Sequence, residues 1–291
     1  MAKQIKNYID IMVPYYFPEA IVASFVGIGV SGGTINFNVL LAFISLSFIF
    51  GGFNTFNSVI DVEIDMISKP YRPLPSGKIT TKNALIYAII LYLLALWIAY
   101  HLTDQFFIIA LISAIITIFY SLPKIKLRKY PLSGNLIGAS FIGLLCPLAG
   151  WALEPSNPIP TYFLGFTFLF SLSLCITKDL EDVPGDRTYS IKTIPVMFGI
   201  KKAIQVAFLL LIFSFVYMIV LIGFNLIEIK FILSLIILLP AFIYSILKIN
   251  AYLKSQVKNS IYELAIARKT FLMLNGLGIL TGLLIGIVAL I

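Results

Sequence analysis

Two acidic segments stand out in a chain of 291 residues that is 60% hydrophobic. They cover residues 57–65 and 178–186, and each closes a long apolar run. Asp182 follows Asp61 by 121 residues, and the same interval separates the last aspartates of the two segments. An Asp-x-x-x-Asp pair therefore recurs half a chain apart. Because carboxylates beside lipid are costly unless they are compensated, four of them in matching positions indicate a shared cation.

The spacing within each segment predicts a row of oxygen ligands. Residues three or four positions apart share a helix face, so the polar side chains of each segment would line up. Six side chains form the two predicted metal-binding rows: Asn57, Asp61 and Asp65 in the first segment, and Asp179, Asp182 and Asp186 in the second. Glu63 and Glu181 point away from these rows, and we expect them to face solvent or nearby basic residues.

Oxygen ligands without histidine or cysteine suit Mg²⁺ rather than zinc or copper. Mg²⁺ usually binds a few carboxylates together with substrate phosphates. Two facing rows would hold a diphosphate through bridging metal ions, and the catalytic core would be Asp61, Asp65, Asp182 and Asp186. The alternative is that these are ordinary helix-end charges at the water interface. Two segments in matching register disfavour that alternative.

Composition predicts an all-α protein that crosses a membrane several times. The mean hydropathy is +1.00, and charged residues make up 12% of the chain, about half the fraction of an ordinary soluble protein. Apolar runs of about 18 residues or more predict transmembrane helices. The nine predicted spans are residues 14–32, 39–56, 84–100, 105–121, 134–153, 161–178, 203–224, 229–249 and 270–291. The polar N-terminal residues predict an interfacial helix rather than a signal peptide.

The basic residues predict the orientation of these spans. Of the 21 lysines and arginines, all but Lys230 fall at the N-terminus or in the loops after spans two, four, six and eight. The positive-inside rule places that side in the cytoplasm, so the N-terminus would be cytoplasmic and the C-terminus external. Both acidic segments open long loops on the cytoplasmic side. The site would therefore face the cytoplasm from a multi-pass protein of the cell membrane.

The interval of 121 residues also predicts an internal repeat within a single domain, residues 1–291. Its halves would be two groups of four helices, residues 14–133 and 134–250, followed by a ninth helix at residues 270–291. A repeat of this kind places a binding site at the interface of its halves. Glycines spaced four residues apart, at 134 and 138 and at 282 and 286, predict close packing of helices.

A stiff basic loop follows the first acidic segment. Residues 69–78 contain three prolines, which exclude a regular helix. Arg72 can donate two hydrogen bonds to phosphate oxygens and is the strongest candidate for binding an anionic substrate. Lys78, and Lys124 in the loop after span four, are further candidates. Their alternative role is to set the membrane topology.

Together these motifs resemble those of the UbiA-type membrane prenyltransferases. The resemblance rests on residues 57–65, 72–77 and 182–187, and it extends to the number of spans and the loops in which the motifs lie. It implies the UbiA-type fold, two Mg²⁺ ions on the acidic segments, and phosphate contacts from Lys178 and Arg187. Many relatives have aspartate directly after the motif asparagine. This chain has Ser58 there, which removes one charge from the first metal site.

Within the family, the motif loops look most like those of archaeal enzymes of ether-lipid synthesis. That resemblance implies transfer of a geranylgeranyl group from geranylgeranyl diphosphate to the glycerol hydroxyl of 3-O-geranylgeranylglyceryl phosphate, a lipid-like acceptor reached from the membrane lipids. An allylic cation would form in an apolar pocket and be captured by that hydroxyl. The sequence indicates no nucleic-acid partner and no obligate protein partner.

Two other functions remain open at this level. The acceptor could be an aromatic ring, as in quinone or chlorophyll synthesis, or a haem. The carboxylates could instead belong to a cation-coupled transporter. Transporters tend to place such groups near the middle of the bilayer, whereas here they lie at the ends of the predicted helices.

Overall fold

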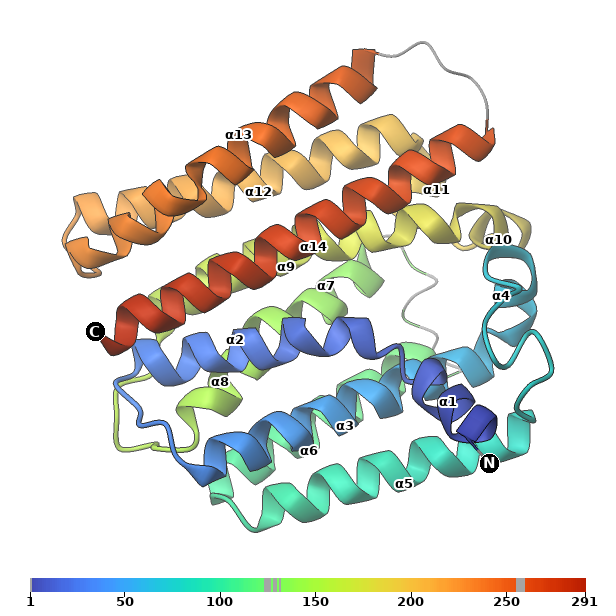
Figure 1. The fold of residues 1–291 in the computed structure, drawn as a ribbon, viewed down its shortest axis with the longest axis horizontal. Helices are drawn as coiled ribbons and strands as arrows, with labels where there is room; N and C mark the ends of the chain where they lie inside the picture. The colour runs from blue at the N-terminus through green and yellow to red at the C-terminus, as the bar shows by residue number, and fades with distance from the viewer. Residues whose placement is uncertain (1, 123–126, 128–129, 131, 255–259) are drawn as a thin grey trace.

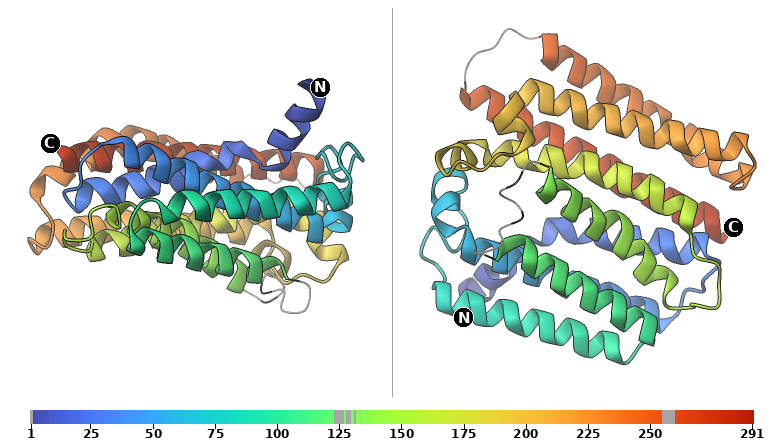
Figure 2. Two further views of the ribbon diagram at one scale, coloured as in Figure 1. Left: turned by 90° about the horizontal axis from the view of Figure 1, so that it is seen from below. Right: turned by 180° about the vertical axis from the view of Figure 1, so that it is seen from behind.

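The structure is a computed structural model that describes residues 2–122, 127, 130, 132–254 and 260–291. Long helices lie side by side in one bundle (Figures 1 and 2). The helices are α1 (Ala2–Ile11), α2 (Phe17–Val30), α3 (Phe37–Ile60), α4 (Val62–Ser68), α5 (Thr81–Tyr100), α6 (Asp104–Ser121), α7 (Ser133–Ser140), α8 (Cys146–Trp151), α9 (Thr161–Lys178), α10 (Val183–Thr188), α11 (Ile194–Phe198), α12 (Ile200–Gly223), α13 (Ile232–Lys254) and α14 (Ser260–Leu290). In the described residues all regular structure is helical.

The predicted fold class is confirmed. Eight helices of the described chain are long and apolar enough to cross a membrane. A ninth crossing is counted if Lys3–Ile11 and Pro14–Val30, which meet at 45°, form one broken span. The break falls at Val13, whose φ of 55° is left-handed, because Pro14 disfavours a right-handed helical residue before it. The N- and C-termini lie at opposite ends of the bundle (Figure 1).

The fifth predicted span is irregular in its middle. A π-helical segment, Phe141–Leu145, joins α7 to α8 just before Pro147. Proline cannot donate a backbone hydrogen bond and crowds the carbonyl four residues earlier. That carbonyl belongs to Gly143, and it accepts a hydrogen bond from Thr167 Oγ1 on α9 at 2.6 Å. The proline distortion is therefore compensated by the neighbouring helix.

The two acidic segments meet at one end of the bundle. There α4 lies against α10 (Figures 1 and 2). The hydroxyl of Ser68 donates to the backbone carbonyl of Asp182 at 3.3 Å and accepts from the backbone N–H of Gly185 at 2.9 Å. Two loops that are far apart in sequence are thereby joined directly.

The predicted rows are not continuous helix faces. In the first segment α3 ends at Ile60, Asp61 leaves the helical region, and α4 starts afresh. In the second segment α9 ends at Lys178, and a 3₁₀ turn, η4 (Asp179–Asp182), precedes α10. Pro184 in the first turn of α10 has no N–H to continue the earlier helix. Asp61, Asp179 and Asp182 are therefore presented from turns, and Asp65 and Asp186 from the short helices α4 and α10.

Glycines bring the central helices into backbone contact. A Cβ atom at Gly27 of α2 would lie 1.9 Å from the carbonyl oxygen of Pro147, and one at Gly150 of α8 would lie 2.0 Å from that of Ser24. On the other side of α2, Gly282 and Gly286 of α14 face Val22 and Phe25. The predicted close packing is confirmed for this glycine pair. It holds α2 between α8 and α14.

We predict that Gly27→Ala destabilises the bundle. The added methyl group would overlap the backbone of α8, which cannot move as a flexible side chain can, and overpacking of this kind costs about 1–3 kcal/mol. Thermal unfolding of the purified protein in detergent measures the loss. Gly276→Ala in α14 is the matched control, since nothing lies within 4 Å of the added atom there. Equal melting temperatures for the two variants would contradict the packing argument.

Candidate active site

A polar cavity of about 390 Å³ lies where the two acidic segments meet. Four of the predicted metal-binding side chains line it: Asn57, Asp65, Asp179 and Asp182. Its cationic side chains are Lys69, Arg72 and Lys178. The cavity therefore combines oxygen ligands for a metal with cations for an anion, and both acidic segments contribute to it.

Two ion pairs cross this cavity. Arg72 Nη1 lies 3.0 Å from Asp65 Oδ2 within the first loop. Lys69 Nζ pairs with Asp182 Oδ1 in the second loop, and both side chains are buried. Because desolvation penalises an unpaired charge, a buried ion pair strongly favours keeping both partners in place. The Lys69–Asp182 pair is thus a charged contact between the two halves of the chain.

Burial and the neighbouring opposite charges have opposing effects on the pKa values of these groups. Burial raises the pKa of Asp65, while Arg72 and Lys69 oppose that rise. Burial likewise lowers the pKa of Lys69, and Asp182 opposes the change. For Arg72, burial lowers the pKa of the guanidinium, but the neighbouring carboxylates of Asp65 and Asp182 outweigh burial and raise it. Arg72 therefore remains a fixed positive charge beside the carboxylates.

Neutral donors position the remaining oxygen ligands. Asn135 of α7 donates from Nδ2 to Asp179 Oδ2 at 2.8 Å, and Ser121 at the end of α6 donates to Asn57 Oδ1 at 3.0 Å. Helices α6 and α7 thereby orient one ligand from each acidic segment. A buried asparagine in an apolar helix was the available sequence signal for Asn135, and the sequence analysis missed it.

Four of the predicted site residues lie elsewhere, and a fifth is outside the described residues. Asp61 and Asp186 are buried but do not line the polar cavity, and Thr193 Oγ1 donates to Asp186 Oδ2 at 3.3 Å. The side chains of Lys78 and Arg187 are exposed to solvent. Lys124 is the residue outside the described ranges, and Ser58 is buried away from the cavity.

The two glutamates of the acidic segments behave as predicted. Glu63 is exposed and accepts a hydrogen bond from the hydroxyl of Tyr189 at 3.4 Å. Glu181 Oε1 lies 3.7 Å from Arg268 Nε. Neither glutamate lines the polar cavity. The predicted placement of the two glutamates is therefore confirmed, whereas Asp61 and Asp186 of the predicted rows do not line the cavity either.

The donor set fits a magnesium ion in its chemistry. Carboxylate and amide oxygens from both loops reach one cavity, and no histidine or cysteine lines it, as Mg²⁺ prefers. Among the described residues, no three acidic, histidine or cysteine side chains stand close enough to form one metal cluster. In this arrangement Lys69 and Arg72 pair with two of the carboxylates instead.

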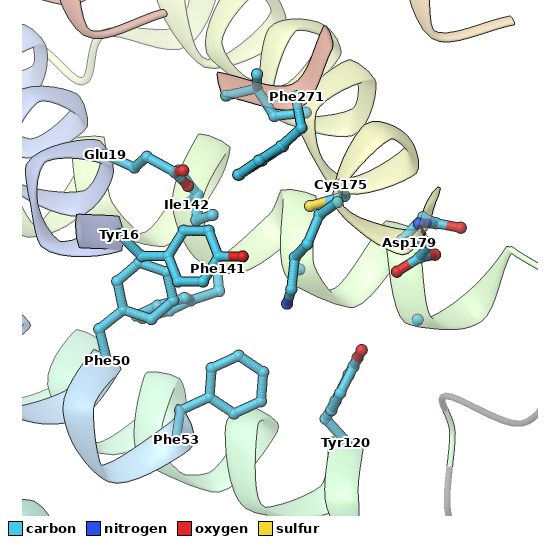
Figure 3. Close-up of a pocket in the computed structure, with 15 residues that line it drawn as sticks. Tyr16, Glu19, Phe50, Phe53, Tyr120, Phe141, Ile142, Cys175, Asp179 and Phe271 are labelled. Carbon is cyan, nitrogen blue, oxygen red and sulfur yellow. Dashed lines mark hydrogen bonds between the residues drawn. The ribbon is translucent and has the colours of Figure 1, made fainter. Parts of the chain in front are cut away.

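An aromatic cavity of about 500 Å³ adjoins the polar one; Figure 3 shows the residues that line it. The two share Tyr16, Tyr120, Lys178 and Asp179. Beyond these residues the wall is formed by rings, chiefly Phe50, Phe53, Phe141 and Phe271. The Lys178 ammonium lies 5.7 Å from the centre of the Tyr16 ring and 5.8 Å from that of Phe53. At this range ring faces attract a cation.

A third, apolar cavity of about 460 Å³ lies deeper in the bundle. It shares Glu19, Ile142 and Leu174 with the aromatic cavity and is lined further by residues such as Val26 and Phe166. The three cavities form a series from the polar end of the bundle into its apolar interior. A molecule with an anionic head and a hydrocarbon tail matches this gradient.

The fold and site define a class of protein: a polytopic helical membrane protein with a charged site that opens into an apolar interior. The family model of the UbiA prenyltransferase family matches residues 20–289, and the chain belongs to that family. It is therefore a membrane prenyltransferase rather than the cation-coupled transporter considered as an alternative.

Among similar sequences, the digeranylgeranylglyceryl phosphate synthase of Methanosphaera stadtmanae is 32% identical over 261 residues, which cover 89% of this chain and 92% of the relative. The enzyme of the same name from Sulfurisphaera tokodaii is 36% identical over 231 residues, covering 74% and 80% of the two chains.

Solved structures show the same fold. A UbiA homolog from Archaeoglobus fulgidus bound to GPP and Mg²⁺ has a TM-score of 0.73 at 20% identity, with 96% of this chain and 99% of that chain covered. A structure reported for digeranylgeranylglyceryl phosphate synthase in membranes has a TM-score of 0.66 at 25% identity and covers 99% of both chains.

We predict that Lys69→Met destabilises the metal-free protein by leaving Asp182 buried without its cation. Removing one partner of a buried pair costs about 3–5 kcal/mol. Thermal unfolding in detergent with a chelator measures the effect, and Lys78→Met, an exposed lysine of the same loop, is the control. The double variant Lys69→Met with Asp182→Asn should recover part of the loss. If the double variant loses as much stability as the single variants Lys69→Met and Asp182→Asn lose when added together, the two residues are not energetically coupled.

Proposed function

We propose that this chain transfers a geranylgeranyl group from geranylgeranyl diphosphate to the glycerol hydroxyl of 3-O-geranylgeranylglyceryl phosphate. The products would be digeranylgeranylglyceryl phosphate and diphosphate. The observation that carries the proposal is the polar cavity, where four oxygen ligands and three cations from both acidic segments converge beside an apolar interior. Relatives of that name at 32–36% identity support the choice of acceptor.

The acidic and the basic residues of the chain would have separate roles. Asn57, Asp65, Asp179 and Asp182 would hold magnesium, with Asp61 and Asp186 as further ligands if the turns rearrange around it. When bound, Mg²⁺ supplies positive charge that neutralises a diphosphate as its bond to carbon breaks. Two ions, one for each acidic segment, remain our proposal. Lys78 and Arg187 are exposed and would attract anionic substrates electrostatically. We propose the same role for Lys124, which lies outside the described residues.

Arg72, Lys178 and Lys69 would bind the diphosphate directly. A guanidinium donates two parallel hydrogen bonds to an anion, and a buried ammonium supplies a point charge. The aromatic cavity would exclude water and place ring faces around the allylic cation, since rings attract cations. The site would face the cytoplasm of the cell membrane, because basic residues concentrate at its end of the bundle.

The carboxylates of both loops should be essential for turnover. We expect Asp65→Ala and Asp182→Ala each to lower Mg²⁺-dependent release of diphosphate by at least about 100-fold, as electrostatic groups at a reacting centre do. Glu63→Ala, an exposed acid in the same segment, is the control and should keep full activity. If both aspartate variants keep full turnover at saturating Mg²⁺, the two-segment site is wrong.

A panel of acceptors tests the substrate assignment. Purified protein would be incubated with labelled geranylgeranyl diphosphate and, separately, the glyceryl phosphate, an aromatic quinone precursor and a haem. We expect an ether product with the glyceryl phosphate alone. A prenylated ring or haem in its place would leave the chain a prenyltransferase of the same family but contradict the proposed acceptor.

A further inference from the structure

Glu19 is a buried acid that the site described above does not use. Among the described residues six acidic side chains are buried, and Glu19 is the one outside the two acidic segments. It lies near the start of α2, within the broken first span. A carboxyl group inside a membrane bundle is costly to keep, so it marks a functional site by default.

The carboxyl group of Glu19 lies at the junction of two cavities. It lines the aromatic cavity together with Lys178 and Asp179, and it also lines the deeper apolar cavity. Figure 3 shows it directed into the aromatic cavity between Tyr16 and Phe271. Any molecule that fills both cavities therefore passes the carboxyl group of Glu19.

The partner of Glu19 distinguishes it from the motif carboxylates. Asn275 of α14 donates from Nδ2 to Glu19 Oε1, so the bonded partner is a neutral amide. Asp65 and Asp182, in contrast, pair with Arg72 and Lys69. A carboxylate can accept several hydrogen bonds, so the bond from Asn275 leaves Glu19 able to accept another from a hydroxyl group.

The proposed reaction needs a group of this kind. The acceptor hydroxyl must lose its proton as its oxygen bonds to the prenyl carbon, and the carboxylates that hold metal or cations are poor proton acceptors. We propose, on the basis of the function proposed above, that Glu19 hydrogen-bonds the acceptor's glycerol hydroxyl and takes up its proton. Asn275 positions the carboxylate for this role.

The step balances without another reactant. The bond between the terminal prenyl carbon and the diphosphate oxygen breaks, and both electrons leave with the diphosphate. The acceptor oxygen forms the new ether bond to that carbon, and its proton passes to Glu19. Glu19 returns the proton to water after the products leave. An alcohol is thus the chemical class that this subsite recognises.

The substitution Glu19→Gln tests proton uptake separately from any structural role of Glu19. The amide oxygen of glutamine can still accept the bond from Asn275, but it cannot act as a base. With geranylgeranyl diphosphate, Mg²⁺ and saturating acceptor, we expect kcat to fall at least about 100-fold, within the range of general base catalysis. The Kd for labelled donor and the melting temperature should stay unchanged. Glu19→Asp, which restores a carboxylate, should keep more than about a tenth of the wild-type kcat.

Other results would overturn the inference. If Glu19→Gln keeps the wild-type kcat, the carboxylate is not the base. If glutamine and aspartate variants lose melting temperature and donor binding in parallel with rate, Glu19 merely joins α2 to α14. Should Glu19→Gln fail to fold, Glu19→Asp and Asn275→Ala decide, because both retain a carboxylate and should keep more than about a tenth of the rate. Wild-type protein inert toward the glyceryl phosphate contradicts the proposed function, not this assignment alone.

Discussion

Compensation of buried carboxylates is the constraint on which the rest of this structure depends. Five aspartates of the two acidic segments are buried, and each would be costly without a partner. Lys69 and Arg72, supplied by the stiff loop after α4, pair with Asp182 and Asp65. The loop between α4 and α5 is therefore part of the candidate site, and its Lys69 joins the two acidic segments through a charged contact.

Close packing around α2 shapes the apolar interior that adjoins the polar end of the bundle. Gly27 and Gly150 let α2 approach α8 to backbone contact, and Gly282 and Gly286 bring α14 along its other side. Because α2 and α14 both line the cavities, their spacing decides how wide the interior is. The π segment before Pro147 belongs to the same design, since it shifts the register of the fifth span beside the aromatic cavity.

Much of the architecture was predictable from the sequence because it depends on hydropathy and on the spacing of residues along the chain. Long apolar runs in lipid favour helices, because their backbone groups must be hydrogen-bonded internally. Eight of the nine predicted spans are single helices long enough to cross a membrane, and the first belongs to the pair of helices that breaks at Val13. The acidic repeat predicted a common site, and Asn57, Asp65, Asp179, Asp182, Arg72 and Lys178 do line one cavity. What failed was the assumption of continuous helices through both segments, because turns at Asp61 and Asp179 redirect the side chains.

The sequence by itself determined the class of protein, and it predicted the end of the bundle where the candidate site lies and the residue types that line it. These depend on local properties: hydropathy, charge and periodicity. Only the tertiary structure decided that Lys69 rather than Lys78 is the buried cation, that Asn135 orients Asp179, and that Glu19 meets Asn275 across 256 positions of sequence. Such contacts arise between helices that are distant in the chain, and no local pattern encodes which of two similar side chains turns inward.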